Sequence, residues 1–79
     1  MTKLMTRTEK EFASALTSMT EDELFVTMGE LEGMSEEPAS DEIKSEVFAR
    51  IVLTESEIER RFPGQLLRPY IDWKERRVI

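Results

Sequence analysis

The sequence contains no cysteine and no histidine. Without cysteine the chain has no disulfide bonds, thiolate metal sites or cysteine nucleophiles. Without histidine it lacks the commonest general base of enzymes and the commonest ligand of transition metals. Its three glycines are scattered along the chain, so no glycine-rich phosphate loop is present. We therefore expect that the protein is not an enzyme and binds no cofactor or metal.

Long apolar runs are also missing. No stretch approaches the roughly 18 apolar residues of a membrane-spanning helix, and the N-terminus lacks the apolar segment of a signal peptide. We therefore expect a cytoplasmic protein without a membrane partner. At 79 residues the chain makes one domain, and a domain of this size buries only about 60% of its surface, which argues against a deep substrate cleft.

Basic residues are absent from the middle of the chain. Residues 21–42 hold nine carboxylates and no Lys or Arg, whereas residues 60–79 hold six basic and two acidic residues. The net charge of −6 disfavours simple affinity for nucleic acid or anionic lipid. The chain thus has an acidic middle and a basic end.

The longest helical signal covers residues 41–62, which contain neither Gly nor Pro. Ser40 precedes this segment and Pro63-Gly64 follows it, as expected of a helix start and stop. Its apolar residues recur at four- and seven-residue intervals on one stripe, with Phe48 and Val52 at the flank. The stripe consists of Ile43, Val47, Ile51, Ile58 and Phe62. We predict one amphipathic helix of about 33 Å.

Thr54 and Glu55 interrupt this stripe with polar groups. The simpler interpretation is that the Thr54 hydroxyl bonds to the preceding turn while Glu55 reaches the edge of the packed face. The alternative is that they mark where a partner inserts.

Three shorter helices are predicted around the long one. Thr8 and Thr20 are each followed three residues later by Glu, the pattern of a capping box, which predicts helices at 9–19 and 21–32. Gly33 is expected to stop the second helix, and the Pro38-containing segment 34–40 to form a loop. Pro69 suits the first position of a last helix over 69–77.

The resulting fold is all-α: a single helical domain over residues 1–79, with residues 1–7 flexible and the short helices packed on helix 41–62. No strand is expected, because every apolar run either has helical spacing or is shorter than four residues. The expected core consists of Phe12, Leu16, Leu24, Phe25, Met28, Leu31, Val47, Phe48, Ile51, Ile58, Phe62, Leu67 and Trp73.

The carboxylates of residues 21–42 form the first candidate site, here called the acidic belt. Capping and solvation explain about half of them, and the bland interpretation is a solvated face. The remainder would attract a partner protein with a basic surface. The candidate protein-binding residues are Glu21, Asp22, Glu36, Glu37, Asp41 and Glu42.

The C-terminal tail, where aromatic and basic residues alternate, is a second candidate interface. The bland interpretation is a terminal helix that docks its apolar side on the core. The alternatives are stacking and phosphate contact with nucleic acid, or an anchor for a protein. The residues concerned are Arg68, Tyr70, Trp73, Lys74, Arg76 and Arg77.

The leading functional hypothesis is a non-catalytic acidic binding module that acts on another protein. Small acidic helical proteins without His or Cys suit inhibitor, antitoxin, immunity or phage-encoded adaptor roles, an argument from class alone. The alternative is a homo-oligomeric, nucleic-acid-associated regulator that uses the basic tail. A chain this small with five Met and four Phe is also expected to self-associate, most simply as a dimer.

Overall fold

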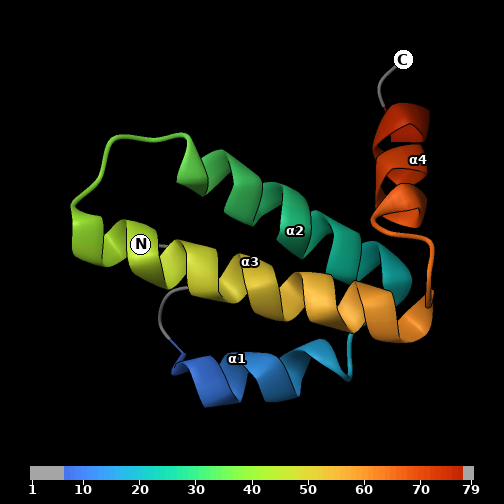
Figure 1. Ribbon diagram of the computed structural model, residues 1–79, viewed down its shortest axis with the longest axis horizontal. Coiled ribbons are helices and arrows are strands. Elements are labelled where there is room, and N and C mark those ends of the chain that lie inside the picture. The colour runs from blue at the N-terminus through green and yellow to red at the C-terminus, as the bar shows by residue number, and fades with distance from the viewer. Residues whose placement is uncertain (1–6, 78–79) are drawn as a thin grey trace.

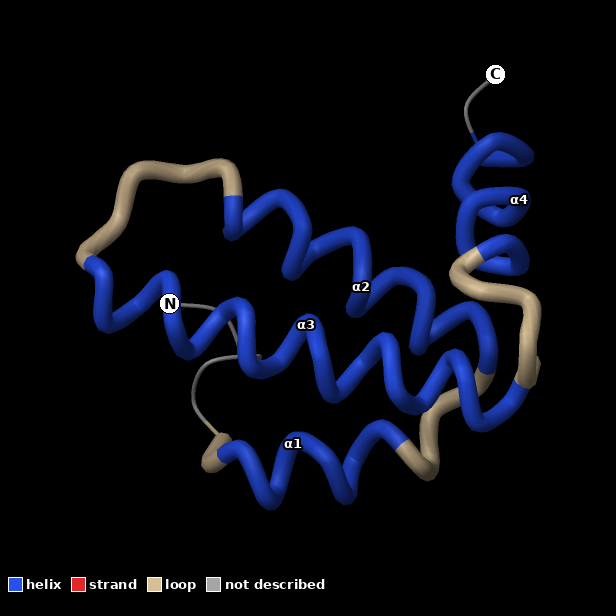
Figure 2. Tube along the Cα trace, viewed as in Figure 1, coloured by secondary structure: helices blue, strands red, loops and turns tan. Residues whose placement is uncertain are grey.

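A computed structural model describes residues 7–77 of the chain, except for the side chain of Arg77. The described part forms four helices and contains no strand (Figure 2). The predicted all-α class is confirmed. The helices are α1 (Glu9–Leu16), α2 (Glu21–Ser35), α3 (Asp41–Arg61) and α4 (Arg68–Arg77).

The long helix α3 lies in the middle of the bundle (Figure 1). Helix α2 packs along one side of α3 and runs antiparallel to it, and α1 packs along the other side. Helix α4 stands across the end of the bundle, beside the start of α2. The N-terminus of α2 and helix α4 therefore share one end, while the loop between α2 and α3 lies at the opposite end. None of the described helices is long and apolar enough to cross a membrane.

The predicted helix starts are confirmed atom by atom. The hydroxyl oxygens of Thr8 and Thr20 each accept a hydrogen bond of 3.1 Å from the backbone N–H of the Glu three residues later. Each Glu carboxylate accepts in return from the backbone N–H of its Thr, which completes both capping boxes. Ser40 caps α3 by accepting from the N–H of Ile43 at 3.2 Å.

The predicted helix ends are less accurate. Helix α1 was predicted to reach residue 19 but ends at Leu16. The carbonyl of Leu16 accepts a hydrogen bond of 2.9 Å from Arg61. Helix α2 continues through Gly33 to Ser35, so the prediction that Gly33 stops it is wrong. Gly33 does not adopt the left-handed conformation of a C-terminal cap, and the glycine that does so is Gly64, at φ +78°.

The last two boundaries shift by one residue. Helix α3 ends at Arg61, and Phe62 has non-helical dihedrals because the following Pro63 disfavours the helical conformation of its neighbour. Helix α4 begins at Arg68, so Pro69 is its second residue. Proline fits there equally well, since the first N–H groups of a helix have no partner within it.

The core lies where α1 and α2 pack on α3 and where α4 packs on α2. Its buried apolar residues are Phe12, Leu16, Leu24, Phe25, Met28, Leu31, Val47, Ile58 and Tyr70. Ile51, Phe62, Leu67 and Trp73 are partly buried against it. Two expectations were wrong: Tyr70 belongs to the core, and Phe48 is 54% exposed. Each residue turns a helix by 100°, so Phe48 points away from the side of α3 that buries Val47.

Candidate functional site

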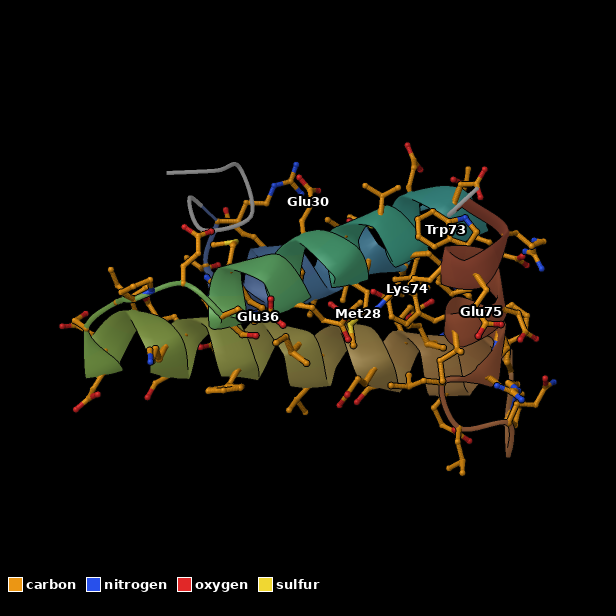
Figure 3. The ribbon with its side chains drawn as sticks, turned by 90° about the horizontal axis from the view of Figure 1, so that it is seen from above. Met28, Glu30, Glu36, Trp73, Lys74 and Glu75 are labelled. Carbon is orange, nitrogen blue, oxygen red and sulfur yellow. The ribbon has the colours of Figure 1, made fainter. Side chains whose placement is uncertain are left out.

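The structure divides the six candidate residues of the acidic belt between two ends of the bundle. Glu21 and Asp22 lie in the first turn of α2, beside α4, whereas the other four candidates surround the loop after α2. Helix α2 has 15 residues, so these two ends are about 22 Å apart. Figure 3 shows Glu36 at one end of α2 and Trp73 at the other. The six candidate residues therefore form two separate groups, with Glu30 and Glu32 between them on α2.

We call the group at the loop the loop-end cluster; it comprises Glu36, Glu37, Asp41 and Glu42. All four side chains are exposed. The ion pairs within residues 7–76 involve other carboxylates, namely those of Glu32, Glu57 and Asp72. The loop-end cluster thus presents four carboxylates to solvent, and none of them forms an ion pair within residues 7–76.

Two other carboxylates of the belt form contacts within the chain: Asp22 at the start of α2, and Glu32, four residues before Glu36. The Trp73 indole N–H donates a hydrogen bond of 2.8 Å to Asp22, and the Tyr70 hydroxyl donates one of 2.6 Å to Glu32. Lys74 lies 3.4 Å from the same Glu32 carboxylate. Acidic belt and basic tail therefore meet in a single molecule, and their contact holds α4 against α2.

The candidate residues of the tail differ in accessibility. Tyr70 is only 2% exposed and packs against Phe25, so the expectation that it belongs to a surface interface is wrong. Burial, assisted by Glu32, raises the pKa of Tyr70 far above its ordinary value. Trp73 is half-buried against Phe25. Both aromatic rings therefore pack on the core, as expected of a terminal helix that docks its apolar side there.

The exposed cations of the tail are Arg68, Lys74 and Arg76, and the side chain of Arg77 lies outside the described residues. Arg68 forms an ion pair of 3.8 Å with Asp72, one turn later in α4. Lys74 is held near Glu32, as described above. Two of these cations thus already have a carboxylate neighbour, which weakens the tail as a phosphate-binding surface.

A polar seam on the α1 side of α3 was not predicted. Arg50, Thr54, Glu57 and Arg61 recur at intervals of three or four residues, so they share one stripe of the helix. The first three are buried. The Thr54 hydroxyl donates to the Arg50 carbonyl at 2.8 Å, which confirms the predicted bond to the preceding turn. This spacing was the signal in the sequence, hidden because Arg and Glu are expected on exposed faces.

The seam ties α1 to α3. Arg50 donates a hydrogen bond of 2.6 Å to the carbonyl of Arg7, and its guanidinium lies 5.9 Å from the Phe12 ring centre. Arg61 bridges the Leu16 carbonyl and Glu57, whose carboxylate is 2.7 Å away. Hydrogen bonds from Arg60 and Arg61 lower the pKa of Glu57 below its ordinary value, although burial opposes them. These contacts give the seam a structural role.

Among residues 7–76 no three acidic side chains converge as a metal site would require. No protein-family model, curated protein or solved structure gives a significant match to the chain. Its function is therefore argued from its own surfaces.

Proposed function

We propose that the protein is a non-catalytic acidic binding module that acts on a partner protein with a basic surface through the loop-end cluster. Roles as an inhibitor, antitoxin, immunity protein or phage-encoded adaptor are of this kind. The carboxylates of the cluster would increase the rate of association with such a partner and orient it at the end of α2 and α3.

The observation behind this proposal is the position of Glu36 and Glu37. They directly follow α2, whose last turn contains no basic residue. The C-terminal end of a helix has partial negative charge, so a nearby carboxylate is unfavourable by about 0.3–1 kcal/mol at an exposed site. Asp41 and Glu42 in the first turn of α3 are favourable there and need no further explanation. The backbone N–H groups of Glu36 and Glu37 bond the last carbonyls of α2, but their carboxylates do not stabilise the helix, which supports a role of these side chains in binding.

The nucleic-acid alternative has less support. It calls for exposed aromatic rings that stack on bases, together with cations that contact phosphate. Tyr70 is buried and Trp73 is held by Asp22, while the chain as a whole has a charge of −6. We therefore rank it second.

The test compares three charge variants after partners have been recovered from the source cell and identified. In the loop-end variant Glu36, Glu37 and Glu42 become Gln. A matched control changes the same number of exposed carboxylates elsewhere, at Glu30, Glu46 and Glu75. A tail variant replaces Lys74 and Arg76 with Gln. Asp22 is kept in all variants, because it holds Trp73 and its loss would disturb α4.

We expect the loop-end variant to bind a protein partner at least tenfold more slowly than the wild type, with the difference shrinking at high salt. The control variant should lose much less, since it changes net charge by the same amount at other positions. Equal slowing in both variants would show that only net charge matters. Loss in the tail variant alone, or recovery of nucleic acid as the partner, would contradict the proposal.

A further inference from the structure

Leu66 has an unusual conformation and an unusual environment. It lies in the connection between α3 and α4 at φ +50°, in the left-handed region that L-residues other than Asn and Asp rarely adopt. Its side chain is nevertheless 82% exposed. Burial in the folded chain therefore does not compensate for the backbone strain. Unfavourable backbone conformations of this kind are concentrated at functional sites.

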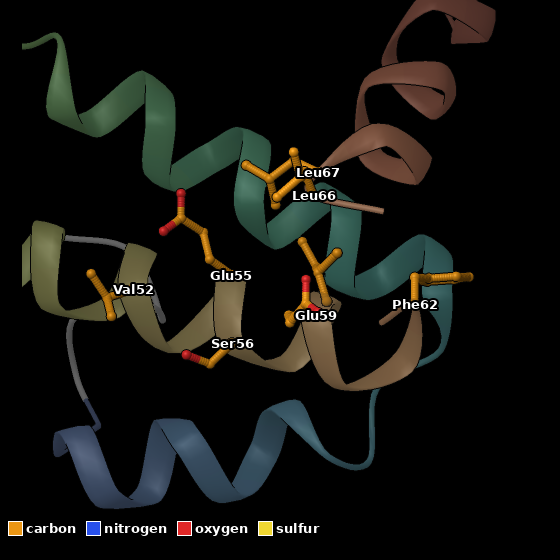
Figure 4. A pocket seen from close by; sticks show the side chains of 8 residues that line it. Val52, Glu55, Ser56, Glu59, Phe62, Leu66 and Leu67 are labelled. Carbon is orange, nitrogen blue, oxygen red and sulfur yellow. The ribbon is translucent and has the colours of Figure 1, made fainter. Parts of the chain in front are cut away.

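A groove lies beside Leu66, between α3 and the connection to α4 (Figure 4). Its volume is about 550 Å³, and more of its lining surface is apolar than polar. It is lined by Val52 on α3, by Phe62 directly after α3, and on the other side by Leu66 and Leu67. Phe48, one turn before Val52, extends this surface along α3, and both side chains are more than half exposed.

Carboxylates border the groove. Glu55 and Glu59 lie on α3 within its lining, as Figure 4 shows. Glu59 also accepts a hydrogen bond of 2.8 Å from the N–H of Gly64, which fixes the connection to the end of α3. The exposed cations nearest in sequence are Arg60 and Arg68, and each is paired with a carboxylate outside the groove, Glu57 and Asp72 respectively. The groove thus has an apolar floor and an acidic edge.

We propose that this groove binds an amphipathic, basic helix of a partner protein. Apolar side chains spaced at three and four residues would contact Val52, Leu66 and Phe48, while Lys or Arg beside them would face Glu55 and Glu59. From Phe48 to Glu59 the surface extends along about 16 Å of α3, which matches about three turns of a docked helix. The proposal concerns a surface separate from the loop-end cluster and does not depend on it.

Charge decides against a second copy of the chain as the occupant. In a symmetric pair each copy presents the same surface, so Glu55 and Glu59 of both molecules would approach each other. The net charge of −6 on each copy adds to this repulsion. A basic helix instead meets an acidic edge and an apolar floor, so both features favour it.

The probe is a fluorescein-labelled, 18-residue peptide of Leu and Lys with Leu at positions a, d and e of each heptad. A control peptide has the same composition in an order that spreads the Leu residues around the helix, so it has the same charge but no apolar helix face. Fluorescence anisotropy should show that the wild-type protein binds the amphipathic peptide at least tenfold more tightly than the reordered one. Equal affinity for the two peptides would mean attraction by charge alone and would overturn the proposal.

Three single variants locate the binding. Val52→Ser and Leu66→Asn should each weaken peptide binding at least fivefold. Val26→Ser is the matched control, because Val26 is an exposed valine of α2 outside the groove. It should bind like the wild type, as should the loop-end variant. Equal loss in Val26→Ser, or loss in the loop-end variant without loss in the groove variants, would overturn the groove as the binding site.

Leu66→Asn also separates binding from folding. Asn tolerates the left-handed conformation, so this variant should have an unchanged or higher melting temperature together with weakened binding. A lower melting temperature with unchanged binding would show that Leu66 serves the fold, against the proposal. Sedimentation equilibrium completes the test: a wild-type dimer that Val52→Ser converts to monomer would make a second copy the occupant and overturn the proposal.

Discussion

Helix α2 has two glycines in its second half, and replacing them tests whether the helix continues as described. Gly29 and Gly33 both have helical backbone, and a Cβ atom added at Gly33 would meet nothing within 4 Å. A Cβ atom at Gly29 would lie 3.5 Å from the Tyr70 hydroxyl, which is ordinary van der Waals contact. Neither position therefore requires glycine.

We expect Gly29→Ala to raise the free energy of unfolding by about 1 kcal/mol and Gly33→Ala by about 0.5 kcal/mol, the smaller gain reflecting its place near the helix end. For a domain of this size 1 kcal/mol corresponds to a rise in Tm of about 4–8 °C. Gly64→Ala should have the opposite effect and cost about 1 kcal/mol or more, because φ there is +78°. Gly→Ala is thus expected to stabilise the protein within α2 and to destabilise it at position 64.

Urea unfolding followed by circular dichroism at 222 nm measures all three variants, with the slope against urea expected to stay unchanged. Stability unchanged or lowered in Gly33→Ala would show that α2 ends before residue 33. Loss of stability in Gly29→Ala would show that Tyr70 packs closer to α2 than the structure has it. A gain in Gly64→Ala would contradict the left-handed turn after α3.

Three further predictions follow from the site. Tyr70→Phe removes the hydrogen bond to Glu32 and should cost about 1 kcal/mol, whereas Tyr70→Ala should cost about 3–5 kcal/mol through lost burial; unequal costs in urea unfolding separate the two effects. The pKa of Glu57 is lower in the folded chain than its value of about 4.5 in the unfolded chain, so the charged carboxylate stabilises the fold above pH 4.5. This stabilisation is lost as the pH falls through the folded pKa. Urea titrations between pH 6 and 3 should therefore show a decline in the free energy of unfolding that is smaller in Glu57→Gln. An undiminished decline in that variant would assign it to other carboxylates. The protein should not bind duplex DNA or RNA at physiological salt, and micromolar affinity that falls steeply with salt in an anisotropy titration would favour the nucleic-acid alternative.

Local signals in the sequence predicted where the helices begin. Thr8, Thr20 and Ser40 each accept a hydrogen bond from the N–H three residues later, which depends on neighbouring residues alone. The end of α3 was almost as predictable, because Pro63 constrains the residue before it. The ends of α1 and α2 were predicted less well. At the end of α1 the Leu16 carbonyl accepts hydrogen bonds from the Met19 N–H and from Arg61, which is 45 residues away in the chain.

The sequence predicted the burial of apolar residues better than the burial of charged ones. Periodicity predicted the apolar stripe of α3, and six residues of α1 and α2 were placed correctly in the core, because apolar spacing reports one buried face. Arg50 and Glu57 were missed, since their burial depends on α1 supplying a carbonyl and on Arg60 and Arg61 supplying charge. The carbonyl that Arg50 contacts is 43 residues away in the chain, and the proximity of Arg60 and Arg61 to Glu57 does not by itself predict that Glu57 is buried. A pattern of residue types does not specify such contacts.

The sequence by itself determined the helical class, the capping residues and the contrast between an acidic middle and a basic end, because these depend on composition and on contacts within a few residues. Tertiary structure decided which charges stay exposed. The α2–α4 contact engages Asp22 and Glu32 with the tail, while the turn after α2 leaves Glu36 and Glu37 in solvent. It also decided that Tyr70 is buried and Leu66 is not, since the crossing of α4 over α2 places one ring in the core and turns the connecting loop outward.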